Sequence, residues 1–281
     1  MAVSAASQRP GVRMALLTLE GTNCDAELAV ALAALGATPE VVHLKQLERR
    51  DVEPGEFRRL ADYQMVWIPG GFAAGDYVRA GAIFAARIRA SIGPELQEFV
   101  RSGRMVAGLC NGFQGLIELG LLPGRPGGRL GPPEAALVAN DSSRYECRPT
   151  FVRWEGGRFP PLRMRPLGER FLFPSGHSEG RLIVAGGRHR LTELEDDGQV
   201  LFRWTGPEGG RAEYPWNPNG SMDDVAGLTN PEGNVFGMMP HPERAFFRVQ
   251  HPDWTRTSSA EGFGDGHRFL DAVVRYAERS H

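Results

Sequence analysis

One short segment, Met105 to Gln114, places tight limits on how this chain can fold. Its apolar first half is followed at once by a helix-like run from Asn111, and Cys110 lies between them with glycines two residues before and two after it. A cysteine in this frame is typical of the sharp turn from a buried strand into a helix. The glycines are expected to be required because a Cβ at either position would collide with neighbouring backbone. A thiol at a helix N-terminus is favoured in its reactive thiolate form, so Cys110 is a candidate nucleophile.

The first 120 residues alternate between strand patterns and helical patterns. Such alternation is typical of a parallel sheet with right-handed crossovers. We therefore predict an α/β fold that is flavodoxin-like, with a mostly parallel sheet flanked by helices. The expected strands cover residues 12–19, 40–44, 64–68 and 105–109, and the expected helices cover 23–36, with Asn23 as cap, 82–101 and 111–119.

The pattern changes after residue 120. Residues 123–133 are dense in glycine and proline and indicate a surface loop. No internal repeat or clean linker is visible, so residues 1–281 are predicted to form a single domain with β-rich additions. In it, the leader 1–11 and the tail 249–281 are expected to be peripheral. The later strands are expected near 135–139, 145–154, 170–173, 181–184, 199–204 and 234–239, and a last helix near 262–279.

A thiol nucleophile needs a histidine as base, and that histidine needs an acid to fix its tautomer. His241 follows an apolar strand pattern, so it is predicted to lie at a strand end, where α/β enzymes place their sites. The flanking prolines are expected to hold the segment extended. In an extended segment residues i and i+2 face the same way, so Glu243 is the predicted orienting acid.

A second His-x-Glu pattern, formed by His177 and Glu179, is a rival for the same role, and its role stays open. Acyl transfer also needs N–H donors for a developing oxyanion. Gly70 and Gly71, directly after a predicted strand, are candidates for one donor, and the N–H of Asn111 is the candidate for the other. Cys24 and Cys147 lack the glycine frame of Cys110, so we interpret them as ordinary cysteines.

Composition narrows the classes of partner. The formal net charge is −2 and no run of lysine and arginine is long enough to suggest a nucleic-acid or membrane surface. Three cysteines fit a reducing compartment rather than a disulfide scaffold. The N-terminus has no secretory pattern, and no apolar run approaches the roughly 18 residues that span a bilayer. The expected location is therefore the cytoplasm, with small molecules or proteins as partners and no metal site.

These motifs resemble those of class I glutamine amidotransferases. Within that family the likeness is to the glutaminase subunits of phosphoribosylformylglycinamidine synthases. It rests on motifs spread from residue 12 to about residue 248. They are Gly-Thr-Asn-Cys-Asp at 21–25, Pro-Gly-Gly-Phe at 69–72, Gly-Asp-Tyr at 75–77, Arg-Ala-Gly-Ala at 79–82, Cys-Asn-Gly-Phe-Gln at 110–114, the Asn140–Arg148 segment, Asn-Pro-Asn-Gly-Ser at 217–221 and Met-Pro-His-Pro-Glu-Arg at 239–244.

The resemblance implies a reaction and a set of roles. Cys110 would attack the side-chain amide of L-glutamine, with His241 as base and acid and Glu243 as orienter. Gln114 would contact the bound glutamine. The segment with Asn140, Ser142 and Tyr145 would line the pocket.

The resemblance also implies partners. Ammonia would pass to a large synthetase subunit, together with a small accessory subunit. The synthetase, rather than this chain, would use ATP and magnesium in purine biosynthesis. No cofactor is expected here, since the chain has no Gly-x-x-x-x-Gly-Lys-Ser/Thr phosphate loop. The chain departs from the compact form of the subunit by extra length near 123–133, 155–170 and after 248.

Two other readings stay open. A related thiol hydrolase, such as a γ-glutamyl hydrolase or a DJ-1-type protein, could use the same elbow. The Asn-Gly-Phe-Gln sequence after Cys110 and the lack of a secretory pattern count against it. A non-catalytic binding subunit is the third reading. The retention of Cys110, His241 and Glu243 together counts against that one.

Overall fold

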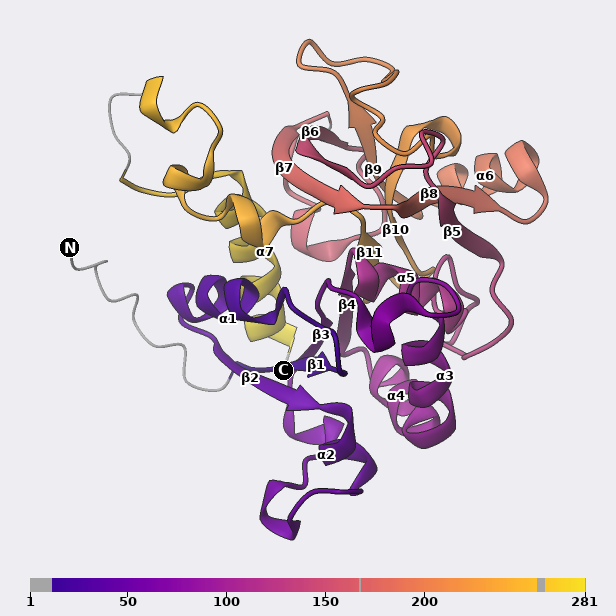
Figure 1. Ribbon diagram of the computed structural model, residues 1–281, viewed down its shortest axis with the longest axis vertical. Coiled ribbons are helices and arrows are strands. Elements are labelled where there is room, and N and C mark those ends of the chain that lie inside the picture. Colours follow the sequence, from indigo (N-terminus) through magenta and orange to yellow (C-terminus); the bar gives the residue numbers. More distant parts are fainter. Residues whose placement is uncertain (1–11, 167, 257–260, 281) are drawn as a thin grey trace.

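The computed structural model describes residues 12–166, 168–256 and 261–280, and Figure 1 shows its elements. At its centre is a nine-stranded sheet in the order β2-β1-β3-β4-β11-β10-β9-β6-β7. The first five strands in this order pair in parallel. They are β1 (Arg13–Thr18), β2 (Thr38–His43), β3 (Met65–Ile68), β4 (Met105–Leu109) and β11 (Val235–Met238). β3 and β4 are buried along their whole length, as expected of parallel strands covered on both faces.

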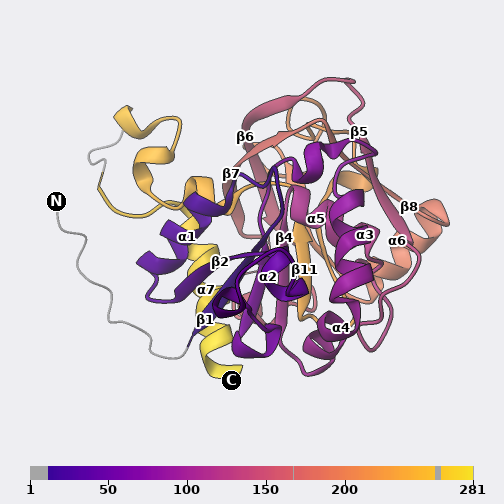
Figure 2. The same cartoon turned by 60° about the horizontal axis from the view of Figure 1, so that its bottom comes forward.

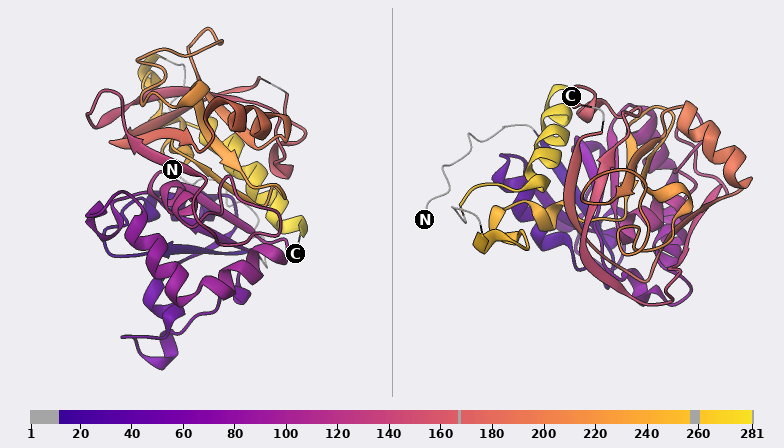
Figure 3. Two further views of the ribbon diagram at one scale, coloured as in Figure 1. Left: turned by 90° about the vertical axis from the view of Figure 1, so that its right-hand side faces the viewer. Right: turned by 90° about the horizontal axis from the view of Figure 1, so that it is seen from above.

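The other four strands of the sheet pair antiparallel and extend it beyond β11. They are β6 (Glu146–Trp154), β7 (Arg170–His177), β9 (Val200–Thr205) and β10 (Val225–Thr229). A separate antiparallel pair consists of β5 (Ala135–Ala139) and β8 (Glu179–Val184). In the left view of Figure 3 the parallel half lies below and these β-rich elements lie above it. The predicted α/β fold with β-rich additions is confirmed.

Helices cover both faces of the parallel half, as Figures 1 and 2 show. On one face α1 and α7 lie side by side, and on the other face lie α3, α4 and α5. The short α2 follows β2, and α6 packs on β8. The bounds are α1 (Asp25–Ala34), α2 (Leu44–Glu48), α3 (Ala82–Ser91), α4 (Gly93–Arg101), α5 (Asn111–Glu118), α6 (Gly187–Asp196) and α7 (Asp265–Ser280). Within the described parts of the chain, no helix has the length and apolar character to cross a membrane.

The prediction of one continuous helix over 82–101 is wrong. α3 ends at Ser91, and α4 begins at Gly93 with Pro94 in its first turn. Proline has no N–H, and its ring collides with the carbonyl group of the preceding turn. A single helix therefore cannot continue through Pro94, whereas the first turn of a new helix accepts it without loss. At α1, the capping residue is Cys24 rather than Asn23, and no side chain caps the helix.

The expectation that the tail 249–281 is peripheral is wrong for α7. Phe269 on α7 is fully buried, and its ring lies 6.3 Å from that of Phe159 and 6.0 Å from that of Phe236 on β11. Phe159 belongs to the extra segment 155–170, and the centroid of its ring lies 4.6 Å from that of Phe236. The two insertions therefore pack on each other and close the core beside the sheet.

Three of the described α-helices and strands, α2, β10 and α6, had no prediction. α2 is only five residues long. β10 is short and contains Gly227, so it has little of a strand's usual signature. α6 buries only Leu191 and Leu194, which leaves a weak helical pattern. Residues 123–133 hold no helix or strand, as predicted. The expected leader 1–11 lies outside the described residues.

Candidate active site

Four loops meet at the carboxyl ends of the parallel strands β1, β3, β4 and β11. In open α/β sheets this edge is where ligands bind. The loops and the neighbouring end of β7 enclose a cavity of about 350 Å³. Its lining residues are Asn23, Cys24, Gly71, Phe72, Cys110, Tyr145, Gly176, His241 and Arg244.

Cys110 stands on the sharp turn between β4 and α5. Its backbone has φ 51° and ψ −106°, which side-chain-bearing residues rarely adopt and which aims the thiol into the cavity. A Cβ on Gly112 would lie 1.9 Å from the carbonyl oxygen of Ile68, and one on Gly108 would lie 2.6 Å from the backbone of Gly112. The predicted need for both glycines is confirmed.

His241 and Glu243 form a buried pair at the end of β11. The Nδ1 atom of His241 lies 2.5 Å from Oε1 of Glu243, and both side chains are almost fully buried. A carboxylate can only accept, so Nδ1 donates and Nε2 is left to face the cavity. His241 is extended, but Glu243 lies in a 3₁₀ turn (Pro242–Ala245) rather than in a continuing extended segment. The carboxylate reaches the ring all the same.

The charge state of His241 follows from these neighbours. Burial by itself lowers the pKa of His241, but the Glu243 carboxylate and the Cys110 thiol outweigh it and raise that pKa to about 10. The imidazole therefore carries a proton at neutral pH. A protonated imidazole beside Cys110 is the partner that a thiolate nucleophile needs.

The rival pair does not form. Burial, aided by the charge of His241, lowers the pKa of His177 to about 3, so its ring is neutral. Its Nε2 lies 3.0 Å from Nδ2 of Asn219. The carboxylate of Glu179 accepts from the N–H of Ala80 at 3.0 Å instead. Both residues hold loops together behind the cavity.

The candidate oxyanion donors surround Cys110. A Cβ on Gly70 would lie 2.8 Å from Cε1 of His241 and 3.3 Å from Cβ of Cys110, so the bare backbone of Gly70 is what leaves this space open. Gly71 lines the cavity with φ 142°. Asn111 is the first residue of α5, and its side chain accepts from the N–H of Ala73 at 3.1 Å. The side chain of Asn111 thus ties the loop after β3 to the elbow.

Most of the other predicted substrate contacts are absent from the cavity lining. Gln114 accepts from Nδ2 of Asn111 at 2.9 Å and donates to the carbonyl of Glu179. Asn140 is buried, and its side chain donates to the carbonyl of His177 at 2.8 Å. Ser142 accepts from the N–H of Arg144 at 3.3 Å. Of these predicted substrate-contact residues, Tyr145 lines the cavity, and the other three are not among its lining residues.

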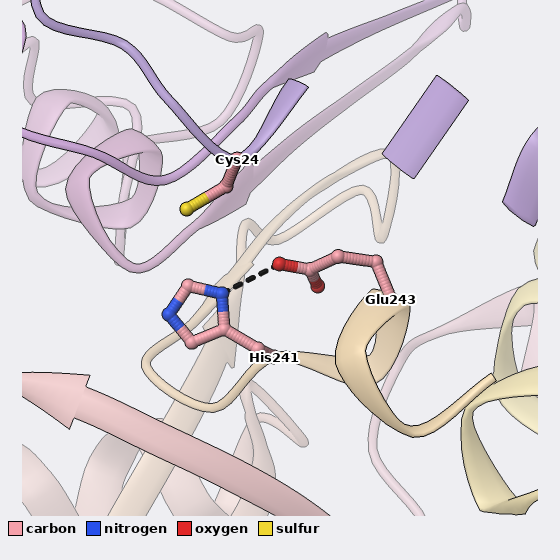
Figure 4. Close-up of side chains that lie close together, drawn as sticks. All are labelled: Cys24, His241 and Glu243. Atoms are coloured by element: carbon pink, nitrogen blue, oxygen red, sulfur yellow. Dashed lines mark hydrogen bonds and ion pairs between the residues drawn. The ribbon is translucent and has the colours of Figure 1, made fainter. Parts of the chain in front are cut away.

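Cys24 and Arg244 are among the lining residues that received no site role in the sequence analysis. Cys24, interpreted as an ordinary cysteine, points its Sγ toward His241 and Glu243, and Figure 4 shows the three side chains together. Burial and the Glu243 carboxylate both raise the pKa of the Cys24 thiol, so it stays protonated. Nη2 of Arg244 donates to Sγ of Cys24 at 3.1 Å. The available signal was position, because Cys24 follows β1 and Arg244 follows the His-x-Glu pattern.

Cys24, His241 and Glu243 have donor atoms within 4.8 Å of one another, close enough to suggest a metal site. However, Nδ1 of His241 and Oε1 of Glu243 are only 2.5 Å apart. Two ligands at about 2.0 Å from one tetrahedral zinc ion would lie farther from each other than that. Their spacing is that of a hydrogen-bonded pair.

Comparisons with known proteins agree with this geometry. A family model described as the CobB/CobQ-like glutamine amidotransferase domain matches residues 11–277. A relative from Archaeoglobus fulgidus, described as phosphoribosylformylglycinamidine synthase subunit PurQ, is 42% identical over 96% of this chain and 99% of its own. A protein of the same description from Picrophilus torridus is 42% identical over 90% and 94%. In the solved structure of PurLQS from Thermotoga maritima, one chain matches with a TM-score of 0.69 and 30% identity, over 94% of this chain and 98% of that one.

Proposed function

This chain belongs to the CobB/CobQ-like glutamine amidotransferase family, and on that premise we propose that it is the glutaminase subunit of a phosphoribosylformylglycinamidine synthase. It hydrolyses L-glutamine to glutamate and ammonia for purine biosynthesis. The observation that carries the chemistry is the elbow residue Cys110 beside the buried, hydrogen-bonded pair of His241 and Glu243. We further propose that residues 1–281 form a single amidotransferase domain, and that the protein works in the cytoplasm.

The first half-reaction forms a thioester. The Cys110 thiolate attacks the side-chain carbonyl carbon of glutamine, and the negative charge moves to the carbonyl oxygen. The N–H groups of Asn111 and of Gly70 or Gly71 stabilise that oxygen. The tetrahedral intermediate collapses, the C–N bond breaks, and Nε2 of His241 gives its proton to the departing nitrogen. Ammonia leaves and a γ-glutamyl thioester remains on Cys110.

The second half-reaction regenerates the enzyme. His241, now neutral, takes a proton from a water molecule that attacks the thioester carbonyl. The C–S bond breaks, glutamate leaves, and the proton on His241 again faces the Cys110 thiolate. Glu243 keeps the ring in one tautomer and one orientation through both steps, as its 2.5 Å contact with Nδ1 requires.

The use of the ammonia and the partner subunits are proposed from the relatives of this chain. One solved neighbour is a PurLQS assembly, which supports a complex with synthetase subunits. We propose that a large synthetase subunit receives the ammonia and uses ATP and magnesium, and that a small accessory subunit takes part. This chain itself needs no cofactor for the steps above, because thiol, imidazole and backbone N–H groups supply all of them.

The test compares glutamate and ammonia release by wild type and Cys110→Ala, with and without the synthetase, its nucleotide substrate and ATP. We expect Cys110→Ala to lose glutamine hydrolysis and, in acid-quenched samples analysed by mass spectrometry, the γ-glutamyl adduct. Wild type is expected to be weak alone and at least about tenfold faster in the complex, since partner docking commonly completes such sites. The exposed Cys147 gives the control variant Cys147→Ala.

Cys24→Ala distinguishes the two thiols of the cavity. It is expected to retain the adduct, because its raised pKa keeps Cys24 protonated. If Cys24→Ala loses the adduct and Cys110→Ala keeps it, the nucleophile is misassigned. If neither variant differs from wild type, the glutaminase proposal fails.

A further inference from the structure

Arg244 is the one arginine, lysine or acid among the described residues that line the cavity, and the triad chemistry does not use it. Its side chain is 39% exposed, so it borders the cavity from the side open to solvent. A guanidinium group offers five N–H donors in a fixed plane, an arrangement suited to carboxylates. A cation placed here gives the cavity a preference for an anionic group.

Two contacts hold the guanidinium group in place. Nε donates to Oε1 of Glu27 on α1 at 2.8 Å, and Nη2 donates to Sγ of Cys24 at 3.1 Å. Both contacts are made by one edge of the guanidinium group, through Nε and Nη2, and they fix the plane of the group against the cavity wall. A cation fixed in this way loses little conformational entropy when it binds a ligand.

The position of Arg244 relative to the triad sets the size of the ligand. The Cys24 thiol is near both groups, because its Sγ lies within 4.8 Å of a nitrogen of His241 and 3.1 Å from Nη2 of Arg244. The guanidinium group and the reacting groups thus border one cavity, with the Cys24 thiol near both Arg244 and His241. In glutamine, four carbon–carbon bonds separate the reacting carbon from the α-carboxylate carbon, about 5 Å when extended. A substrate of that length can have its amide beside Cys110 and its α-carboxylate directed to Arg244 within the cavity that both residues line.

We propose that Arg244 binds the α-carboxylate of the substrate, and so restricts this site to free α-amino acids that carry a γ-carboxamide. This inference rests on the proposed glutaminase function. It gives Arg244 a specificity role that Cys110, His241 and Glu243 do not have. Substrates whose α-carboxyl group is esterified or part of a peptide bond are disfavoured, although their side-chain amide is the same.

The test uses the complex with its synthetase and two substrates, L-glutamine and L-glutamine methyl ester, in which only the side-chain amide releases ammonia. Wild type should favour glutamine in kcat/KM by on the order of 10- to 100-fold, the worth of a charge-assisted contact. Arg244→Gln should lose that preference, mainly through a raised KM for glutamine, while its activity on the ester changes little. Arg244→Lys should restore part of the preference.

Glu27→Gln is the matched control, because it removes the same ion pair from the other side and leaves the guanidinium group. It should keep the preference for glutamine, because the amide oxygen of the substituted side chain can still accept from Nε of Arg244 and hold the guanidinium group in place. Equal losses on both substrates in Arg244→Gln, with the preference unchanged, would show that Arg244 only joins the loop after β11 to α1 and would overturn the inference. Absence of glutamine hydrolysis in wild type would instead refute the underlying function, so the two failures are distinguishable.

Discussion

Gly112 packs so closely on Ile68 that a Cβ on Gly112 would lie 1.9 Å from the Ile68 carbonyl oxygen. This contact joins the first turn of α5 to the end of β3. It therefore fixes the elbow of Cys110 against the loop that carries Gly70 and Gly71. Gly112→Ala must move one of these backbones. We expect a loss of about 3 kcal/mol or more in unfolding free energy and a fall of at least about 100-fold in glutaminase kcat.

The same helix provides the control for that variant. A Cβ on Gly115 would meet no other atom within 4 Å. Gly115→Ala should therefore match or exceed the wild-type stability, since alanine is favoured over glycine in a helix by about 1 kcal/mol. Urea unfolding and glutaminase assays of both variants check this. Similar losses in the two would show that the elbow does not depend on the contact with Ile68.

Glu243→Gln should change both the rate and its pH dependence. In wild type the pKa of His241 is raised to about 10, because the Glu243 carboxylate and the Cys110 thiol outweigh burial. Without the carboxylate that pKa falls, and the alkaline limb of the kcat/KM profile should move to lower pH. We also expect kcat to drop by roughly 100-fold or more, the usual worth of a positioned acid–base group.

Histidine NMR titration of the same variant measures the pKa directly. Glu179→Gln, from the second His-x-Glu pattern, is the control and should leave the His241 titration in place, since its carboxylate bonds to the N–H of Ala80. An alkaline limb that does not move in Glu243→Gln would contradict the assigned role of Glu243.

His177→Gln should change how the free energy of unfolding depends on pH. The folded-state pKa of His177 is lowered from 6.5 to about 3 by burial and by the charge of His241. Below pH 6.5 the unfolded chain therefore binds a proton at this residue that the folded chain does not, and stability falls as the pH falls. Removing the group should make this slope shallower by up to one proton, about 1.4 kcal/mol per pH unit.

Urea unfolding between pH 4 and pH 7 measures that slope. Glutamine can still accept from Nδ2 of Asn219, the present partner of His177. His189→Gln, which removes an exposed histidine, is the matched control, and the comparison is the difference in slope between the two variants. Equal slopes would show that His177 takes up a proton in the folded protein.

The parts of this site that can be predicted from sequence alone are those formed by residues close together in the chain. The elbow of Cys110 needs a strand, two glycines and a helix within ten residues, and the pair of His241 and Glu243 is two residues apart. Burial of β3 and β4 follows from their apolar runs. Each of these depends on local sterics or periodicity, which one sequence carries.

The rest depends on which loops the sheet brings together. Cys24 enters the cavity because β1 lies two strands from β4, and Arg244 reaches Cys24 across 220 residues of sequence. Gln114 lies on the predicted helix, but its side chain is hydrogen-bonded to Asn111 and to the carbonyl group of Glu179. Such contacts are set by tertiary packing, and no spacing in the sequence encodes them.

The aromatic cluster around α7 tests whether the last helix belongs to the core. Phe269 is fully buried, with its ring within 6.3 Å of those of Phe159, Phe173, Phe202 and Phe236. Phe269→Ala removes most of this contact and leaves a cavity, so unfolding free energy should fall by about 3–5 kcal/mol. Met164→Ala is the control, because Met164 is 95% exposed and its loss should change stability by less than about 0.5 kcal/mol. A peripheral tail would instead give two variants of equal stability in urea unfolding. Because α7 also contacts the 3₁₀ turn that carries Glu243, Phe269→Ala should lower glutaminase activity as well, by less than Glu243→Gln does.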